Sequence, residues 1–571
     1  MIKVAFGNIY SRPLDLEGNY ERADEKVKQA KARGADLIVF PQGFLSGTEL
    51  GMLGKADALS EDRDWFIRQY NSLTEKLSDE NEGIYILTDY AILGEGRAEF
   101  FCQLYLDGRD IDWDSELTIK GVNIKILEEK SGLEEVSGAY DCFILMDQSP
   151  AVGGERYLLH KAMKELAEKS NAAVCANLGG YGYTSHPDVY MPCIAFIDGD
   201  KDIFTRTVGE YAGYEGLIEV RSGKRKEFEF AIEPDSLAFP VAYSANPMIP
   251  ANVPEKEYCM DLFTLQTTAL AARMQNLGMK DAVLALSGGL DSSMALLVTV
   301  NAFDMLGLDR KGIHVVSMPG FGTSNTTKSL AEELAASLGL EFKFIDITAA
   351  CRQALLDIGH DGVTPDVTFE NVQARMRTLN GLNLANMYNG LMIGTGDLSE
   401  EAMGFSTYGG DHLASYNVNS SVSKTVMRTM LPYVTELDNL AGRKDTVRKI
   451  LDIPVSPELV PHGGEILQKT EEILAPYKLI DFYIYCLTVA GTAPDEMAYE
   501  AGKVFGDEFS KEYLEEKARM FMKRFISGQF KRSSAPEGAV TTHVHLNAAL
   551  RSLPSDATPK ALIRMAKGEL F

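Results

Sequence analysis

Apolar and polar residues follow two different patterns along the chain, and the change lies near residue 250. In the first part, short apolar runs typical of strands alternate with a few amphipathic helices. The predicted strands are 2–7, 36–40, 84–93, 122–127, 142–146, 172–176 and 193–197. The predicted helices are 20–33 and 156–169. Residues 1–235 are therefore predicted to form a layered α/β domain with mixed sheets.

The second part alternates strands and helices in the order that a doubly wound parallel sheet requires. It is preceded by a stretch with little periodicity, 233–257, which holds five of the 21 prolines, so we place a linker at 236–257. The predicted strands of the second domain, 258–571, are 282–286, 313–318, 342–347 and 391–394. Its predicted helices are 291–306, 326–338 and 371–388, and a mainly helical extension starts near 421.

Composition and charge narrow the classes of partner. The chain has 571 residues, 45% hydrophobic and 24% charged, as ordinary globular proteins do. Its formal charge of −26 repels phosphate backbones and anionic lipid, so we expect neither nucleic acid nor membrane as a partner. Seven scattered cysteines without a CxxC pair indicate a reducing compartment and no structural zinc. With no signal-peptide pattern at the N-terminus, we expect a cytoplasmic protein.

The segment 284–292, LALSGGLDS, carries the clearest chemistry. Gly288 and Gly289 let the backbone approach a phosphate, and the following helix start points N–H groups at it. Ser287 and Ser292 add hydroxyl donors, and Asp291 can hold a cation that bridges phosphates. Two glycines alone would suit any turn between a strand and a helix, but this position lies at the ligand-binding edge of a parallel sheet. A Walker loop is absent from the sequence.

SGGLDS resembles the pyrophosphate loop of ATP pyrophosphatases, which adenylate a substrate. Further motifs resemble NAD synthetase in their order and context. These are MPGFGTS at 318–324, ENVQARMR at 370–377, GTGDLSE at 394–400, GFSTYGGDHLASYNVNSSVSKT at 404–425, SPEL at 456–459 and QFKR at 529–532. The resemblance implies ATP and Mg²⁺ as co-substrate and cofactor, and deamido-NAD and ammonia as the other substrates.

The resemblance also assigns binding residues. For ATP it implies Ser287, Gly288, Gly289, Leu290, Asp291, Ser292, Met318, Thr395, Lys424 and Ser456. For deamido-NAD it implies Asn371, Arg375, Glu400, Asp411 and Lys531. Singly, Arg375 and Lys531 also suit a solvated surface, and Asp411 also suits a helix cap.

Three of these residues form the expected catalytic set, Asp291, Glu400 and Lys424. Asp291 and Glu400 both follow predicted strands, so their carboxylates should face one point and suit Mg²⁺. Lys424 would stabilise the negative charge that develops on the phosphates.

The first domain resembles the nitrilase-like amidase domain that supplies ammonia from glutamine in two-domain NAD synthetases. The resemblance rests on VAFGNIYSRPLDLEGNYERA, GADLIVFPQGFLSG, DQSPAVGGER and ANLGGYGY. That domain uses a Glu base, a Lys and a Cys nucleophile. Here Gln42 follows Phe-Pro where the base belongs, Leu127 stands where the nucleophile belongs, and Lys120 is at the wrong place. Cys175 and Cys193 fit buried apolar positions better than a nucleophile.

These observations predict an ammonia-dependent NAD synthetase with a degenerate glutaminase domain, assembled as a homo-oligomer. Two alternatives stay open. One is an active glutamine-dependent enzyme whose triad has moved, and the other is a dinucleotide-binding scaffold without catalysis.

Overall fold

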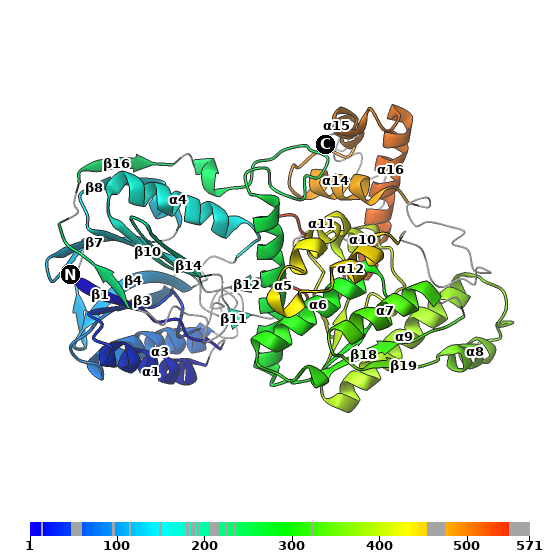
Figure 1. The fold of residues 1–571 in the computed structure, drawn as a ribbon, viewed down its shortest axis with the longest axis horizontal. Coiled ribbons are helices and arrows are strands. Elements are labelled where there is room, and N and C mark those ends of the chain that lie inside the picture. The colour runs from blue at the N-terminus through cyan, green and yellow to red at the C-terminus, as the bar shows by residue number, and fades with distance from the viewer. Residues whose placement is uncertain are drawn as a thin grey trace. The chain divides into compact units, whose positions relative to one another are not determined.

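The computed structural model divides into two compact units, Met1–Ala151 with Glu155–Ala238, and Val152–Gly154 with Phe239–Phe571 (Figure 1). The structure describes residues 1–12, 15–46, 60–93, 98–112, 116–128, 130–147, 151–178, 182–183, 189–190, 193–205, 217–223, 226–232, 234–321, 325–453 and 474–546. In this part of the chain, no helix combines the length and the apolar character needed to cross a lipid bilayer.

Two six-stranded sheets form the centre of the first unit. One has the order β15-β1-β2-β3-β4-β5 and the other β14-β13-β10-β9-β7-β6. The first sheet comprises β1 (Ile2–Phe6), β2 (Leu37–Val39), β3 (Tyr85–Leu93), β4 (Ala98–Leu106), β5 (Arg109–Ile111) and β15 (Ile218–Val220). The second comprises β6 (Glu116–Ile119), β7 (Val122–Glu128), β9 (Cys142–Asp147), β10 (Ala173–Leu178), β13 (Cys193–Asp198) and β14 (Lys201–Thr205). Both contain parallel and antiparallel pairs, as expected for mixed sheets.

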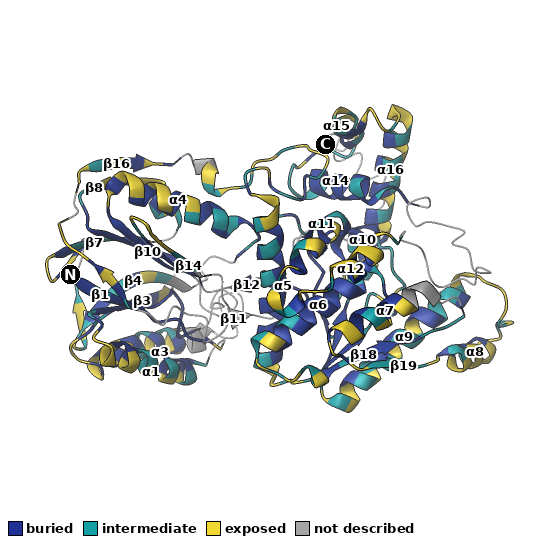
Figure 2. Ribbon diagram, in the orientation of Figure 1, coloured by how far each residue is buried: buried dark blue, intermediate teal, exposed yellow. Residues whose placement is uncertain are grey.

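Helices cover the outer faces of these sheets, so the unit is an α-β-β-α sandwich. Alternate residues of the strands, such as Val4, Val39 and Ile144, fill the core between the sheets. The outer face of the first sheet packs against α1 (Leu16–Ala32) and α3 (Ser60–Asp79), and that of the second against α4 (Glu155–Ser170). Figure 2 shows the strands buried and the outward sides of α1 and α4 exposed.

The helix α3 and the strands β4 to β6 were not predicted. Phe66, Tyr70 and Leu77 recur at helical spacing in α3 and are buried, so the signal for this helix was present. The smaller elements of the unit are β8 (Glu135–Gly138) paired with β16 (Phe228–Ala231), and β11 (Gly182–Tyr183) paired with β12 (Val189–Tyr190).

The second unit is built on a five-stranded sheet in the order β19-β18-β17-β20-β21, with every pair parallel. Its strands are β17 (Ala282–Ala285), β18 (Ile313–Ser317), β19 (Phe342–Phe344), β20 (Leu391–Gly394) and β21 (Tyr416–Asn417). The chain runs from β17 outward to β19, then returns to the other side of β17 as β20. The predicted parallel α/β sheet is confirmed, although β19 is shorter than the predicted strand because a helix follows at Thr348.

Helices surround this sheet and form the C-terminal part. They are α5 (Glu255–Leu277), α6 (Leu290–Met305), α7 (Asn325–Ser337), α8 (Thr348–Asp357), α9 (Val367–Tyr388), α10 (Leu398–Met403), α11 (Lys424–Val434) and α12 (Lys444–Leu451). Further along are α14 (Tyr477–Thr488), α15 (Met497–Phe505), α16 (Lys511–Ser527) and α17 (Gln529–Arg532). The segment 239–254 was expected within the linker. It contacts α14, where the Tyr485 hydroxyl accepts a hydrogen bond from the Ala242 N–H at 2.9 Å.

His543 provides a pH-dependent contribution to the stability of this unit. Burial, with His545 as a second cause, lowers the pKa of His543 to about 4 from the usual 6.5. Its ring centroid lies 4.7 Å from that of Phe239 and 6.1 Å from that of Tyr258. The unfolded chain therefore binds the proton more readily, so stability present above pH 6.5 is lost as the pH falls toward 4.

The difference in free energy of unfolding between the wild type and His543→Phe should fall by up to about 3 kcal/mol between pH 7 and pH 4. Denaturant titrations at both pH values measure it. A difference independent of pH would contradict the buried neutral state of His543.

Candidate functional site

The loop between β17 and α6 has the geometry of an anion-binding site. Gly288 has φ +88°, a left-handed conformation that favours glycine, and Gly289 is the N-cap of α6. The Ser287 hydroxyl accepts a bond from the Gly289 N–H at 3.2 Å and lies 3.1 Å from the Ser292 hydroxyl. The first N–H groups of a helix lack carbonyl partners, so they can bind phosphate oxygens.

The strand order brings a second loop to the same place. Neighbouring strands β17 and β20 lead into chain segments that leave the sheet in opposite directions, and ligands bind at such switch points in open α/β sheets. The amide of Asn419 joins the two loops, because its Nδ2 donates to the backbone oxygens of Asp291 and Thr395, each at 3.1 Å. Gln266 in turn donates to Asn419 Oδ1 at 3.1 Å.

Lys424 lies at the centre of three carboxylates. Its Nζ is 2.7 Å from Asp291 Oδ1, 2.6 Å from Asp397 Oδ2 and 2.9 Å from Glu400 Oε1. The side chains of Lys424 and Asp397 are 1% and 0% exposed, whereas Asp291 and Glu400 reach the surface in part. The structure thus brings together the three residues of the predicted catalytic set and adds Asp397.

The charges of this cluster do not balance. Burial alone would lower the pKa of Lys424, but the carboxylates of Asp291, Asp397 and Glu400 outweigh it and raise that pKa well above its usual value. Burial also raises the pKa values of Asp397 and Glu400, in spite of the favourable Lys424 charge. Three acidic groups share one ammonium, so the site favours a further proton or cation.

This donor set fits a divalent cation. Asp291, Asp397 and Glu400 each offer one carboxylate oxygen, and these oxygens lie within 4.8 Å of one another. Hard cations such as Mg²⁺ take oxygen ligands, with water and substrate phosphates completing the shell. The sequence predicted only Asp291 and Glu400 as ligands.

Asp397 was missed although a local signal exists. It is the N-cap of α10, where its Oδ1 accepts from the Glu400 N–H at 2.8 Å. The pattern Asp-x-x-Glu after a strand is a helix-start signature. Tyr477 was also missed, and its ring centroid lies 5.2 Å from Lys424 Nζ, within cation–π range.

A pocket of about 70 Å³ lies beside this cluster. It is lined by Thr395, Asp397, Glu400, Asp411 and Lys531, together with residues 396, 401, 404, 406, 412, 417, 532, 535 and 536. Three of the five residues expected to contact deamido-NAD therefore line one pocket.

The other two residues expected to contact deamido-NAD, Asn371 and Arg375, do not line this pocket but form hydrogen bonds with the segment 404–412. Asn371 Oδ1 accepts from the Thr407 hydroxyl at 2.9 Å, and Arg375 Nε donates to the Tyr408 oxygen at 3.1 Å. Lys531 donates to the backbone oxygens of Gly404 and Ser406. Arg375 is exposed, and Asp411 accepts from the Thr407 N–H at 2.7 Å within a turn rather than at a helix start.

Leu290, Met318 and Ser456 are the remaining residues that were predicted to contact ATP. Leu290 begins α6, and Met318 is buried just after β18, with its backbone oxygen accepting from Arg377 Nε at 3.0 Å. Ser456 lies outside the described residues.

In the first unit, Gln42 and Leu127 have different neighbours. Gln42 is buried, and its Nε2 lies 3.9 Å from Sγ of Cys102, which is part of the core between the two sheets. Leu127 packs in the core between the second sheet and α4. Lys120 pairs with Asp36 at an exposed position. All seven cysteines are buried, including Cys175 and Cys193 on central strands.

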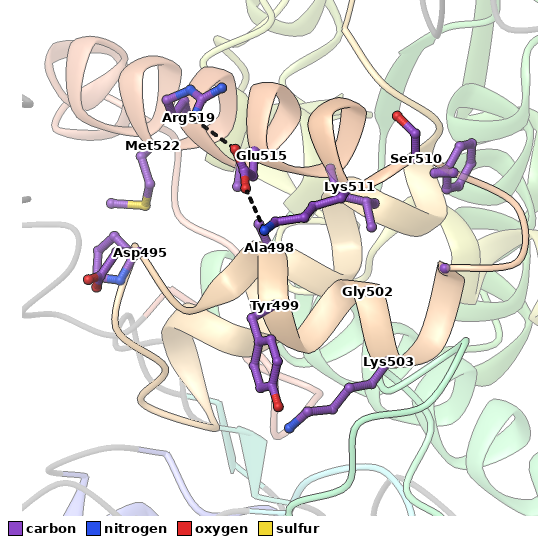
Figure 3. A pocket seen from close by; sticks show the side chains of 15 residues that line it. Asp495, Ala498, Tyr499, Gly502, Lys503, Ser510, Lys511, Glu515, Arg519 and Met522 are labelled. Carbon is purple, nitrogen blue, oxygen red and sulfur yellow. Dashed lines mark ion pairs between the residues drawn. The ribbon is translucent and has the colours of Figure 1, made fainter.

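A larger cavity of about 810 Å³ lies between α15 and α16 (Figure 3). Tyr499, Lys503 and Lys511 line it, and Glu515 pairs there with Lys511 and Arg519. It contains none of the predicted site residues.

A parallel α/β sheet with an anion-binding loop and an acidic cluster at its switch point defines the class of the second unit as a nucleotide-binding domain. Residues 263–534 match the NAD synthase family. A glutamine-dependent NAD(+) synthetase of Mycobacterium leprae is 35% identical over 346 residues, 56% of this chain and 51% of that protein. One from Thermotoga maritima is 26% identical over 544 residues, 85% of this chain and 88% of that protein.

The fold comparison extends over the whole chain. A crystal structure of a glutamine-dependent NAD(+) synthetase from Cytophaga hutchinsonii matches with a TM-score of 0.71 at 14% identity, covering 99% of both chains. The chain spans about half the length of the mycobacterial relatives that it matches. The resemblance of the second domain to NAD synthetase is thereby confirmed, and the chain as a whole has the fold of a glutamine-dependent NAD(+) synthetase.

Proposed function

We propose that this protein is an NAD synthetase that adenylates deamido-NAD with ATP and then amidates it with ammonia. The observation that carries the proposal is the convergence of the 287–292 loop, the acidic cluster around Lys424 and the adjoining pocket at one sheet edge. The match of residues 263–534 to the NAD synthase family supports it.

Chemistry explains why such a site is needed. A carboxylate does not react with ammonia at neutral pH, because its oxygen is a poor leaving group. In the proposed reaction, the nicotinate carboxylate attacks the α-phosphorus of ATP, and the bond to pyrophosphate breaks. Ammonia then attacks the acyl carbon, AMP departs, and the added nitrogen loses a proton to give the amide.

The chain's own residues bind and orient the reactants. The N–H groups at the start of α6 and the hydroxyls of Ser287 and Ser292 hold phosphate oxygens. Lys424, fixed by its carboxylate partners, faces the negative charge that develops on the leaving pyrophosphate. Mg²⁺ held by Asp291, Asp397 and Glu400 would supply additional charge neutralisation at the phosphates.

We further propose that the nitrogen source is free ammonia or ammonia from another protein. The relatives are named glutamine-dependent. In this chain, however, Gln42 cannot accept a proton from a thiol and Leu127 cannot attack an amide. The apolar packing of Leu127 and the surface position of Lys120 support a first unit without glutaminase activity.

Pyrophosphate release tests the adenylation step. The wild type should release pyrophosphate from ATP only when deamido-NAD is present. Asp291→Asn keeps the shape of the side chain but removes its charge, so it should slow release by roughly 10²–10³-fold. Asp304→Asn is the matched control on the same helix, since Asp304 pairs with Arg310. Near-normal release by Asp291→Asn would refute the role of Asp291, and binding of ATP without any release would favour a scaffold.

A further inference from the structure

Asp481 on α14 is a buried carboxylate, 1% exposed, that no part of the proposed mechanism uses. Its Oδ1 accepts from the Ser399 hydroxyl. Its Oδ2 accepts from Thr425 twice, from the backbone N–H at 3.0 Å and from the hydroxyl at 2.6 Å. Ser399 and Thr425 are the chain neighbours of Glu400 and Lys424.

These bonds connect the first turns of two helices. Ser399 lies at the start of α10, whose first turn carries Glu400, and Lys424 is the first residue of α11. The hydroxyl of Ser399 donates to Asp481 and at the same time accepts from the Lys424 backbone N–H at 3.0 Å. One carboxylate therefore sets the position of α11 relative to α10, and with it the reach of the Lys424 ammonium.

The same helix also supports the ammonium directly. Tyr477 precedes Asp481 by four residues, so the two side chains lie on one face of α14. The ring of Tyr477 covers Lys424 Nζ, and Asp481 holds the backbone next to it. The opposite side of the helix contacts α16, where the Tyr483 hydroxyl donates to the Leu514 oxygen at 2.9 Å.

We propose that Asp481 is a positioning residue for the adenylation step, which holds Lys424 and Glu400 in their catalytic arrangement through Ser399 and Thr425. The inference rests on the proposed function, because it assigns Asp481 a part in that reaction. Asparagine keeps the shape of the side chain but leaves one acceptor oxygen for the donors of Ser399, Ser423 and Thr425. Its NH₂ group would also face donors, so at least one buried group would lose its partner.

The first measurement is the steady-state kinetics of Asp481→Asn. The kcat for pyrophosphate release should fall by at least about tenfold, since a misplaced charge acts on the transition state. The KM values for ATP and deamido-NAD should stay within about threefold, because the 287–292 loop and the pocket residues are unchanged. A variant that was only less stable would keep its kcat per folded active site well below its melting temperature, so the rates are measured there and divided by the fraction of folded protein.

The second measurement does not depend on catalysis. Trace acetylation with acetic anhydride, followed by mass spectrometry, reports how far each lysine amine is protected. The buried, ion-paired Lys424 should be protected in the wild type, and its labelling should rise about fivefold or more in Asp481→Asn through local opening.

Tyr483→Phe is the matched control. It removes a buried hydrogen bond from the same helix, on the side away from the cluster, so it should lower the melting temperature without changing kcat or Lys424 labelling. Ser399→Ala breaks the link between Asp481 and the Lys424 backbone, so it should lower kcat. Its effect should not add to that of Asp481→Asn.

Unchanged kcat and unchanged labelling in Asp481→Asn would overturn the proposal, as would equal effects in Tyr483→Phe. If Asp481→Asn does not fold, Ser399→Ala is used for both measurements with the same criteria. If the wild type releases no pyrophosphate, the proposed function is wrong, and the labelling alone decides whether Asp481 positions Lys424.

Discussion

Replacing Lys424 with methionine is expected to abolish pyrophosphate release and to lower the free energy of unfolding by about 3–5 kcal/mol. Methionine has a similar length but no charge. Asp291, Asp397 and Glu400 would then lie close together without the ammonium that each of them contacts. Removing one partner of a buried ion cluster costs more than the cluster contributes, because the remaining charges stay buried and repel one another.

The pH dependence distinguishes this explanation from a simple packing defect. Without Lys424, the pKa values of Asp397 and Glu400 should rise further, above those in the unfolded chain. A carboxyl group with a raised folded-state pKa favours the folded state only when it is protonated. The stability deficit of Lys424→Met should therefore shrink as the pH falls from about 8 to about 5.

Lys449→Met is the control for this experiment. Lys449 pairs with Glu333 on the surface, where its side chain is 55% exposed, so its loss should have little effect on stability. Denaturant titrations of both variants across this pH range give the comparison. A constant deficit for Lys424→Met would mean that the carboxylates are not the cause.

The second large effect concerns the nitrogen source. With deamido-NAD, ATP and Mg²⁺, ammonium should support NAD formation by the purified chain. Glutamine freed of ammonia should support none. An amidase needs a nucleophile, a base and a lysine that act as a unit, and positioning alone does not supply the covalent step. The readout is NAD measured with each nitrogen donor.

A single Leu127→Cys change should not restore the use of glutamine, because the new thiol would have neither its base nor its lysine. NAD formed from glutamine by the wild type, and lost when one particular cysteine is blocked, would show that the nucleophile has moved. The buried state of all seven cysteines argues against such a site.

Local patterns predicted four strands and three helices of the parallel-sheet region of the second unit to within a few residues. The strand at 391–394 and the helix after the glycine loop are examples, because buried strands and amphipathic helices repeat at different periods. Prediction failed where the pattern of apolar residues was short or interrupted. No element was predicted over the helix Thr348–Asp357, since only two of its residues, Cys351 and Leu355, are buried and they give a weak periodic signal.

The functional site was likewise predicted only in part, because local motifs could be recognised and long-range contacts could not. The phosphate loop could be identified from SGGLDS alone, because an anion site at a helix start needs only neighbouring residues. Asp397 could have been identified from its N-cap pattern, but its contact with Lys424 could not. Asn419, Tyr477 and Asp481 act through neighbours far away in the chain, and no short pattern marks such contacts.

The sequence by itself determined the order of elements and the glycine loop, since these depend on local composition and spacing. Only the tertiary structure decided that Asp291 and Lys424, 133 residues apart, form an ion pair with Asp397 and Glu400 around them. The reason is the strand order. The chain returns to β17 as β20, so the ends of two strands distant in sequence become neighbours, and their loops share one charge cluster.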